Sequence, residues 1–185
     1  MEAGFTWQLR DWAGISASEI GAAIEKTIKS KGYIPIRNLT GHRLGRYIVH
    51  AGQSIPNIGG TNSHILSEGE VYAIEPFSVP RDALGKVTDG APSNIYRFLK
   101  KRKVKSDQAK KMLKLIQRKY RTLPFASRWI LRESSGPESA EAFQELLETK
   151  CIYSYPQLVE ASGAPVAQAE HTVIVESDGC TVTTA

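Results

Sequence analysis

The sequence of 185 residues is poor in cysteine and contains no long apolar run. Its two cysteines, Cys151 and Cys180, are too few for a disulfide framework or a cysteine-rich zinc cluster, so a reducing cytoplasm is the expected location. No apolar stretch approaches the ~20 residues that a membrane-spanning helix needs. Residues 1–14 lack the charged-then-apolar order of a secretory signal. The sequence therefore predicts a cytoplasmic globular protein without a membrane partner.

Acidic residues are almost absent from one long segment. Residues 94–132 contain 14 of the 24 Lys and Arg residues but only one of the 19 acids, Asp107, which gives this segment a charge of +13. The other 10 basic and 18 acidic residues leave the rest of the chain at −8. A basic insert on an acidic body can mark a surface that meets polyanions, and the plainer interpretation is the solvated face of a helix.

Helical periodicity occurs in several places. Ser16 and Glu19 have the spacing of a capping box, and apolar residues then recur at helical intervals as far as Gly32. Ser106 or Asp107 can cap a further helix, whose apolar positions alternate with lysine and arginine. Two more helices are predicted at residues 3–12 and 139–150.

The remaining pattern is that of short strands. Pro35 keeps its neighbours out of a helix interior, and Asp178-Gly179 between two β-branched runs is a strong hairpin signal. Residues 53–67, 80–92 and 153–159 are interpreted as loops or turns. With extended segments at 33–39, 47–51, 71–76, 167–175 and 180–184, the sequence predicts an α+β fold in which a helical insertion interrupts an antiparallel sheet.

Three residues stand out as candidates for chemistry: His42, Glu75 and Glu170. The glycine before His42 indicates a tight backbone where something approaches closely. Glu75 ends an apolar strand and Glu170 lies within one, where a carboxylate needs a partner because an unpaired buried charge is costly. A divalent metal would satisfy two glutamates and a histidine together. Taken singly, each is more often an edge or ion-paired glutamate, or a structural histidine.

Three longer motifs resemble those of type 2 methionine aminopeptidases, particularly the archaeal kind. They are residues 35–42 (PIRNLTGH), 68–77 (EGEVYAIEPF) and 168–172 (QAEHT), and they occur in the family's order. The step from His42 to His50 also fits this type, and the basic helical stretch lies where the type carries an extra helical subdomain. The resemblance covers nearly the whole chain.

The resemblance implies a partial pita-bread (creatinase/aminopeptidase-like) fold. Residues 1–93 and 156–185 would form the C-terminal half of its catalytic domain, and residues 94–155 the basic helical insertion subdomain. In the family, two α/β halves surround a dinuclear metal centre. The metals implied are two divalent ions per complete site, with Co²⁺, Mn²⁺, Fe²⁺ and Zn²⁺ all compatible with oxygen and imidazole ligands.

The resemblance also assigns roles to single residues. His42, Glu75 and Glu170 are implied to be metal ligands, with Glu170 bridging both ions. His50 is implied to contact the bound peptide near the scissile bond. Glu75 and His50 are thus the implied catalytic residues, and Glu75 would carry a proton. Weaker matches place Ile48, Asn94 and Tyr155 near the methionine pocket. His171 follows an implied ligand on a strand and so points the opposite way, which indicates a structural role, and His64 is interpreted as a loop residue.

The implied reaction is removal of the N-terminal initiator methionine from nascent proteins. A water activated by two metals attacks the carbonyl after the methionine, and the metals stabilise the developing oxyanion. The implied substrates are nascent peptide N-termini that begin with methionine. The ribosome is a further candidate partner.

The sequence departs from the family pattern before His42. The family has two aspartate ligands on strands of the N-terminal half and a further histidine, none of which has a counterpart here. We therefore expect the chain to begin about one subdomain late and, with three ligands, to have little or no activity on its own. The aspartates that do not fit the required strand context are Asp11, Asp82, Asp89, Asp107 and Asp178.

Two alternatives remain beside the aminopeptidase hypothesis. The chain could be a non-catalytic pita-bread module that binds RNA or the ribosome through its basic insert. Retention of all three ligands argues against this, because a binding module would not need them. The chain could also be an incomplete gene product or a fragment.

Overall fold

The computed structural model describes residues 13–61, 64–134 and 136–184. Two compact units are present: unit 1 is formed by the described residues of Met1–Thr88 and Val159–Ala185, and unit 2 by those of Asp89–Leu158. These boundaries lie close to the division predicted at 93/94 and 155/156. The helix predicted at residues 3–12 lies outside the described residues. Among the described helices, none combines the length and apolar character that crossing a bilayer requires.

The first described helix of unit 1, α1 (Ala17–Ser30), confirms the predicted capping box. The backbone N–H of Glu19 donates to Ser16 Oγ (3.2 Å), and the N–H of Ser16 donates to the Glu19 carboxylate (2.9 Å). Each side chain thereby satisfies a free N–H of the first turn. Gly32 adopts a positive φ of 82° just past the helix end, as a terminating glycine does. The buried positions of α1 are Ala17, Ile20, Gly21, Ile24 and Ile28.

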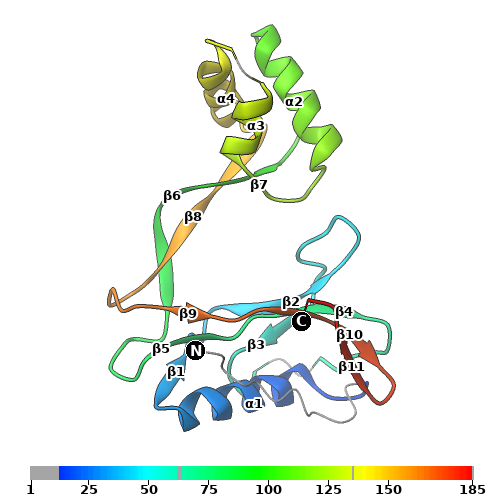
Figure 1. Ribbon diagram of the computed structural model, residues 1–185, viewed down its shortest axis with the longest axis vertical. Helices are drawn as coiled ribbons and strands as arrows, with labels where there is room; N and C mark the ends of the chain where they lie inside the picture. The colour runs from blue at the N-terminus through cyan, green and yellow to red at the C-terminus, as the bar shows by residue number, and fades with distance from the viewer. Residues whose placement is uncertain (1–12, 62–63, 135, 185) are drawn as a thin grey trace. The chain divides into compact units, whose positions relative to one another are not determined.

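A five-stranded antiparallel sheet lies against α1 in unit 1 (Figure 1). The helix face packs on Tyr72 and Ile74 of one strand and on Val173 and Val175 of another, all fully buried. The predicted hairpin is confirmed, because Glu176 pairs with Gly179 across the turn. In the order β11-β10-β4-β2-β3, the strands are Gly179–Val182, His171–Glu176, Val71–Ile74, Thr40–Leu44 and Ser54–Pro56.

A second, three-stranded sheet of unit 1 has the order β1-β5-β9, formed by Tyr33–Pro35, Phe77–Pro80 and Ala167–Gln168. The continuous strand predicted at 167–175 is therefore wrong, because β9 and β10 are separated by Ala169 and Glu170. The opposite chain is interrupted at the same place, by Glu75 and Pro76. Proline has no N–H to donate to a sheet ladder, which explains the break.

The segment 47–51 is also not extended, contrary to the prediction. Gly45 and Ile48 exchange backbone hydrogen bonds of 2.8 and 2.9 Å, so the chain reverses tightly between them. Tyr47 adopts a positive φ of 61° in this reversal, a conformation that side chains with a Cβ rarely take. The sequence carries no glycine or asparagine at this position to signal the turn.

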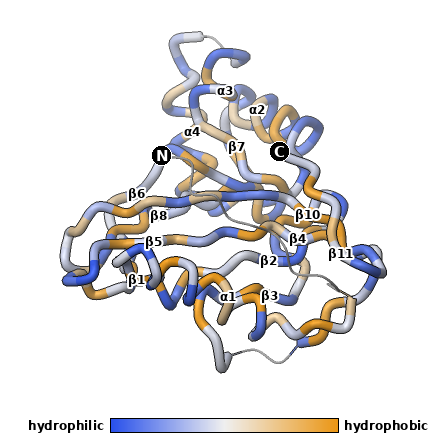
Figure 2. Tube along the Cα trace, turned by 60° about the horizontal axis from the view of Figure 1, so that its bottom comes forward, coloured by the Kyte–Doolittle hydropathy of each residue, from blue (hydrophilic) through white to orange (hydrophobic). Residues whose placement is uncertain are grey.

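The described residues of unit 2 contain three helices and most of a three-stranded sheet. The basic helix α2 (Asp107–Lys119) is confirmed, with Ser106 as its cap: Ser106 Oγ accepts from the N–H of Ala109 (3.1 Å). Hydrophobic and hydrophilic residues alternate along α2 (Figure 2). Its buried positions are Ala109, Met112, Leu113 and Ile116. The other helices are α3 (Ser127–Glu133) and α4 (Ser139–Glu148), and the strand order β7-β6-β8 comprises Phe125–Ala126, Val87–Phe98 and Ile152–Glu160.

The loop predicted at 53–67 is wrong in part, because it contains β3. The loops predicted at 80–92 and 153–159 are also wrong in part, because they contain the start of β6 and most of β8. Few residues of either β6 or β8 are buried. Their sequences therefore lack the alternation of apolar and polar residues that predicts a strand. Each strand also contains a proline, Pro92 or Pro156, which argues against a central strand when read from sequence.

A buried carboxylate closes the turn at the end of β8. Glu160 is only 2% exposed, and its Oε2 accepts from the N–H of Ser162 (2.6 Å), the Ser162 hydroxyl (2.5 Å) and the N–H of Ala164 (3.4 Å). The Ser162 hydroxyl hydrogen bond, followed by the backbone N–H groups, lowers the pKa of Glu160 to about 2 against the opposing effect of burial.

We predict that Glu160→Gln destabilises the protein at neutral pH and not in strong acid. The folded-state pKa lies below the ordinary value of 4.5, so the carboxylate stabilises the fold above about pH 4.5 and loses this effect as the pH falls toward 2. Urea unfolding of both proteins at a series of pH values measures the difference in unfolding free energy. A difference that stays constant over this range would contradict the prediction.

We also predict that Gly41→Ala destabilises unit 1. A Cβ at Gly41 would lie 2.3 Å from the carbonyl oxygen of Ala73 on the neighbouring strand, and backbone atoms there cannot yield easily. Overpacking of this kind costs about 1–3 kcal/mol of unfolding free energy. Gly179→Ala is the matched control, since a Cβ there meets no atom within 4 Å. Equal losses for the two variants in chemical unfolding would show that the close approach is unimportant.

Candidate metal centre

His42 and Glu75 meet at the edge between β2 and β4. His42 Nε2 and Glu75 Oε1 are 2.9 Å apart, with side chains only 12% and 15% exposed. Gly41 makes this possible, because its missing Cβ lets β2 approach the backbone of β4. The expectation of a close approach before His42 is confirmed, and the approaching group is a neighbouring strand.

The pairing with Glu75 favours the protonated form of the His42 ring. The hydrogen bond to Glu75 raises the pKa of His42, while partial burial opposes the shift. Nδ1 on the other side of the ring is buried and has no hydrogen-bond partner in the described part of the chain. The carbonyl groups of Arg43 and Val49 add to the pKa shift without completing such a bond.

Glu170 lies opposite Glu75 in the sheet. Ile74 pairs with His171 and Phe77 pairs with Gln168, so one register runs through the break and sets Glu75 against Glu170. Directly opposite residues of antiparallel strands project from the same face, with Cβ atoms about 4.5–5.5 Å apart. Glu170 is nevertheless exposed rather than buried within an apolar strand as predicted. Its position outside any strand explains this difference.

His50 is brought beside His42 by the tight turn after β2. The two ring centres are 4.1 Å apart and the planes are tilted by 48°. The N–H of Ala51 donates to the carbonyl of Arg43 (2.8 Å), which fastens the end of the turn to β2. His50 is exposed, so its ring faces both His42 and solvent. Ile48, from the same turn, is 52% exposed.

A polar network supports β2 from behind, and the sequence pattern did not predict it. Arg43 pairs with Glu70 (3.2 Å), and Glu70 also accepts from the hydroxyl of Tyr72 (2.9 Å) and the N–H of Ser67 (3.0 Å). Burial, together with the bond to Glu70, raises the pKa of the Tyr72 hydroxyl. The network joins β2 to the turn before β4. In the sequence, the only sign of this network was the presence of two charged residues, Arg43 in β2 and Glu70 just before β4.

The other candidate residues belong to several different elements. His64 contacts the Tyr72 hydroxyl (3.2 Å) and His171 contacts Thr184 Oγ1 (3.2 Å), so neither faces Glu75. Asn94 and Tyr155 belong to unit 2. Of the aspartates, Asp11 lies outside the described residues, Asp82 follows β5, Asp89 is an exposed residue of β6 rather than of a loop, Asp107 begins α2 and pairs with Lys110, and Asp178 is in the hairpin turn.

The donor atoms present fit a divalent ion in part. An imidazole nitrogen and a carboxylate oxygen already converge, and a second carboxylate lies opposite the first. These are donor types that Zn²⁺, Mn²⁺ and similar ions accept. Within residues 13–61, 64–134 and 136–184, no three His, Cys, Asp or Glu side chains are close enough to form a ready-made metal site. Movement of Glu170 toward Glu75 would complete a three-ligand set.

Comparison with known sequences gives consistent relatives. The chain is 48% identical over 172 residues to the methionine aminopeptidase of Methanothermobacter thermautotrophicus, covering 93% of this chain and 57% of the relative. It is 46% identical over 173 residues to that of Thermococcus onnurineus, covering 93% and 58%. The chain thus spans somewhat more than half the length of these relatives.

Solved structures share the fold. The structure of a thermophilic Arx1 matches with a TM-score of 0.68 and 19% identity, over 91% of this chain and 45% of that one. Methionine aminopeptidase from Thermotoga maritima matches with a TM-score of 0.51 and 21% identity, over 95% and 44%. These likenesses confirm the α+β, pita-bread class of the chain.

The model of metallopeptidase family M24 matches residues 6–177. The match includes His42, Glu75 and Glu170 and all three motifs on which the resemblance was based. It also spans the whole of unit 2. The chain is a member of metallopeptidase family M24, similar over nearly all of its length to archaeal methionine aminopeptidases.

Proposed function

We propose that this chain provides one side of the metal centre of a methionine aminopeptidase, which removes the initiator methionine from nascent proteins. The observation that carries the proposal is the 2.9 Å approach of His42 to Glu75, with Glu170 opposite Glu75 in the strand register. The similarity to archaeal methionine aminopeptidases supports it.

Three side chains would hold metal. His42 Nε2 and Glu75 Oε1 point at one another, so an ion between them would replace the hydrogen bond that they now share. Glu170 would add a carboxylate from the opposite chain. When bound, a pair of divalent ions supplies water activation near neutral pH and stabilises negative charge on the scissile carbonyl. Two ions per complete site, drawn from Co²⁺, Mn²⁺, Fe²⁺ and Zn²⁺, are part of the proposal.

The proposal assigns three further roles. His50 is exposed beside His42 and would donate a hydrogen bond to the carbonyl of the bound peptide. Gln168 Nε2 donates to Glu75 Oε2 (3.4 Å), which orients the carboxylate that would accept and pass on a proton. Ile48 is exposed on the same turn as His50 and would contact the methionine side chain.

A non-catalytic RNA-binding module is the less favoured function. The relatives that match over 93% of the chain are methionine aminopeptidases. The three ligand types also remain in the sequence, whereas a binding module would be free to lose them.

We predict that the chain binds one Mn²⁺ or Co²⁺ ion weakly and that His42→Ala and Glu75→Ala abolish this binding. Three ligands hold one ion poorly because much of its coordination shell is left to water. Calorimetric titration, or the visible absorption of bound Co²⁺, measures the affinity. His171→Ala is the matched control, since His171 contacts Thr184 rather than Glu75. An unchanged affinity in both site variants would refute the assigned ligands.

We predict little or no turnover of a Met-Ala peptide by the chain alone, even with added Co²⁺ or Mn²⁺. Activity should appear when the part of the Methanothermobacter relative outside the match is joined to this chain. Glu75→Ala should then lower kcat/KM by more than the ~10–100-fold that loss of an outer-shell partner costs.

Two outcomes would count against this prediction. Turnover by the chain alone that disappears in Glu170→Ala would show that the isolated half-site suffices. A folded fusion protein without any aminopeptidase activity would refute the proposed function.

A further inference from the structure

A run of basic residues in unit 2 is held as a fixed surface strap. The basic strap, residues 100–105, contains five Lys or Arg residues and one apolar residue, Val104. At its start, the N–H of Leu99 donates to the carbonyl of Cys151 (2.9 Å). Near its end, Val104 is buried in the core of unit 2. The strap is therefore anchored to the helical body at both ends.

Glu145 completes the anchoring without neutralising the strap. Its carboxylate accepts the backbone N–H of Lys105 and the N–H of Ser106 (3.2 Å). These bonds, led by that from Lys105, lower the pKa of Glu145. The Glu145 carboxylate on α4 thus accepts backbone N–H groups at the end of the strap and forms no ion pair with the strap's side chains in the described part of the chain. In the described part of the chain, no ion pair joins an acid to Lys100, Lys101, Arg102 or Lys103.

The outer side of α2 continues the basic character. Lys111, Lys114 and Arg118 are exposed at intervals that place them on one side of a helix. Two other lysines of α2 are ion-paired, Lys110 with Asp107 of the same helix and Lys119 with Glu133 of α3. Among the described residues, no ion pair involves Lys111, Lys114 or Arg118. We call the strap and these three residues the basic face.

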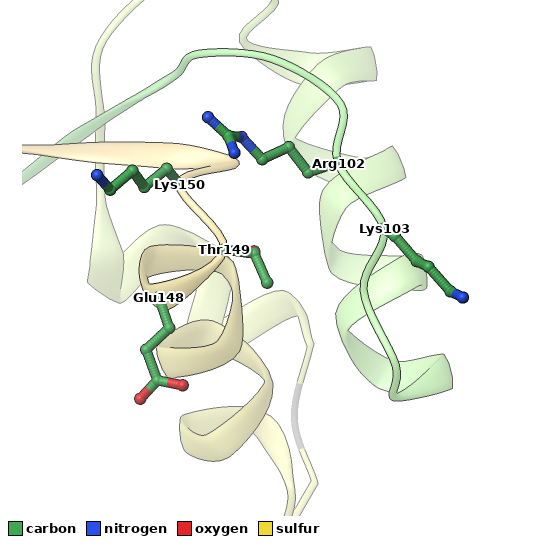
Figure 3. Close-up of a pocket in the computed structure, with 5 residues that line it drawn as sticks. All are labelled: Arg102, Lys103, Glu148, Thr149 and Lys150. Atoms are coloured by element: carbon green, nitrogen blue, oxygen red, sulfur yellow. The ribbon is translucent and has the colours of Figure 1, made fainter.

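An open hollow lies beside the strap and indicates the kind of anion that fits. It is lined by Arg102, Lys103, Glu148, Thr149 and Lys150, with Arg102 and Lys103 leaving the strap on different sides (Figure 3). Glu148 and the C-terminal end of α4 both contribute negative charge there. These features disfavour a closed site for one small anion. Cations on both sides of an extended strap suit a long polyanion instead.

A membrane surface fits the basic face less well than a nucleic acid does. A peripheral membrane helix needs an apolar face to insert beside its basic one. The apolar face of α2 is already buried, at Ala109, Met112, Leu113 and Ile116. Binding to a phosphate backbone needs only positioned cations. Lys and Arg side chains that neutralise phosphates release the counterions condensed on the nucleic acid, which favours binding.

We propose that the basic face binds the phosphate backbone of RNA without reading its sequence. The choice of RNA rests on the proposed function, since nascent proteins emerge beside ribosomal RNA. The surface lies in unit 2, whereas the candidate metal ligands lie in unit 1. RNA binding and metal binding therefore use different residues, and a substitution that abolishes one is expected to leave the other unchanged.

The test is fluorescence anisotropy of the 185-residue chain with a labelled RNA duplex of about 20 base pairs, across about 50–200 mM KCl. In the strap variant, Lys100, Lys101, Arg102 and Lys103 are all changed to Gln. We expect its affinity to fall at least about 10-fold, and the salt slope to fall by about 0.9 for each phosphate that the variant no longer neutralises. A variant with Lys111, Lys114 and Arg118 changed to Gln should show a smaller loss of the same kind.

The matched control changes Lys26, Lys31, Arg81 and Lys86 to Gln, which removes the same charge from unit 1. Equal losses in the strap and control variants would overturn the proposal, because net charge alone would then explain binding. Absence of RNA binding by the unaltered chain at the lowest salt would also overturn it. So would tighter binding to phosphatidylserine vesicles that RNA does not displace. RNA binding retained in His42→Ala would support a surface separate from the metal centre.

Discussion

The close approach of β2 to β4 is the constraint on which the candidate site depends. Gly41 has no Cβ, and the carbonyl of Ala73 occupies the space that a side chain would need. This approach sets the next residue, His42, within 2.9 Å of Glu75. The pair Arg43–Glu70 then fixes β2 from its other side. A single missing side chain thus lets two strands bring an imidazole and a carboxylate together.

The second constraint is the break shared by two paired chains. Pro76 ends one ladder, and the register continues unchanged beyond it. The residues within the break, Glu75 and Glu170, occupy opposite positions of that register outside regular strands. A carboxylate there avoids the cost of burial in a sheet core, yet its backbone remains held on both sides. Such a place suits a ligand that must be both positioned and accessible.

The two units divide the charge of the molecule as well as its chemistry. The sheet unit carries the candidate metal ligands, whereas the helical unit carries most of the basic residues. In the helical unit several acids are used by the backbone or by neighbouring lysines, as Glu145 and Asp107 show. The surface is consequently basic for two reasons: it carries many cations, and several nearby acids are already bonded to the backbone or to other lysines.

The sequence by itself determined the features that depend on local chemistry. Neighbouring residues decide the N-terminal caps and periodicity of α1 and α2 and the Asp178-Gly179 hairpin, so these features were predictable. The family motifs could be read directly from the sequence. Only the tertiary structure decided that β6 and β8 are strands, because their pairing partners lie far away in sequence and their residues are mostly exposed. It also decided that residues 45–51 turn back, which sets His50 against His42, and that Glu170 is exposed opposite Glu75. These outcomes depend on contacts between distant segments, which no local pattern encodes.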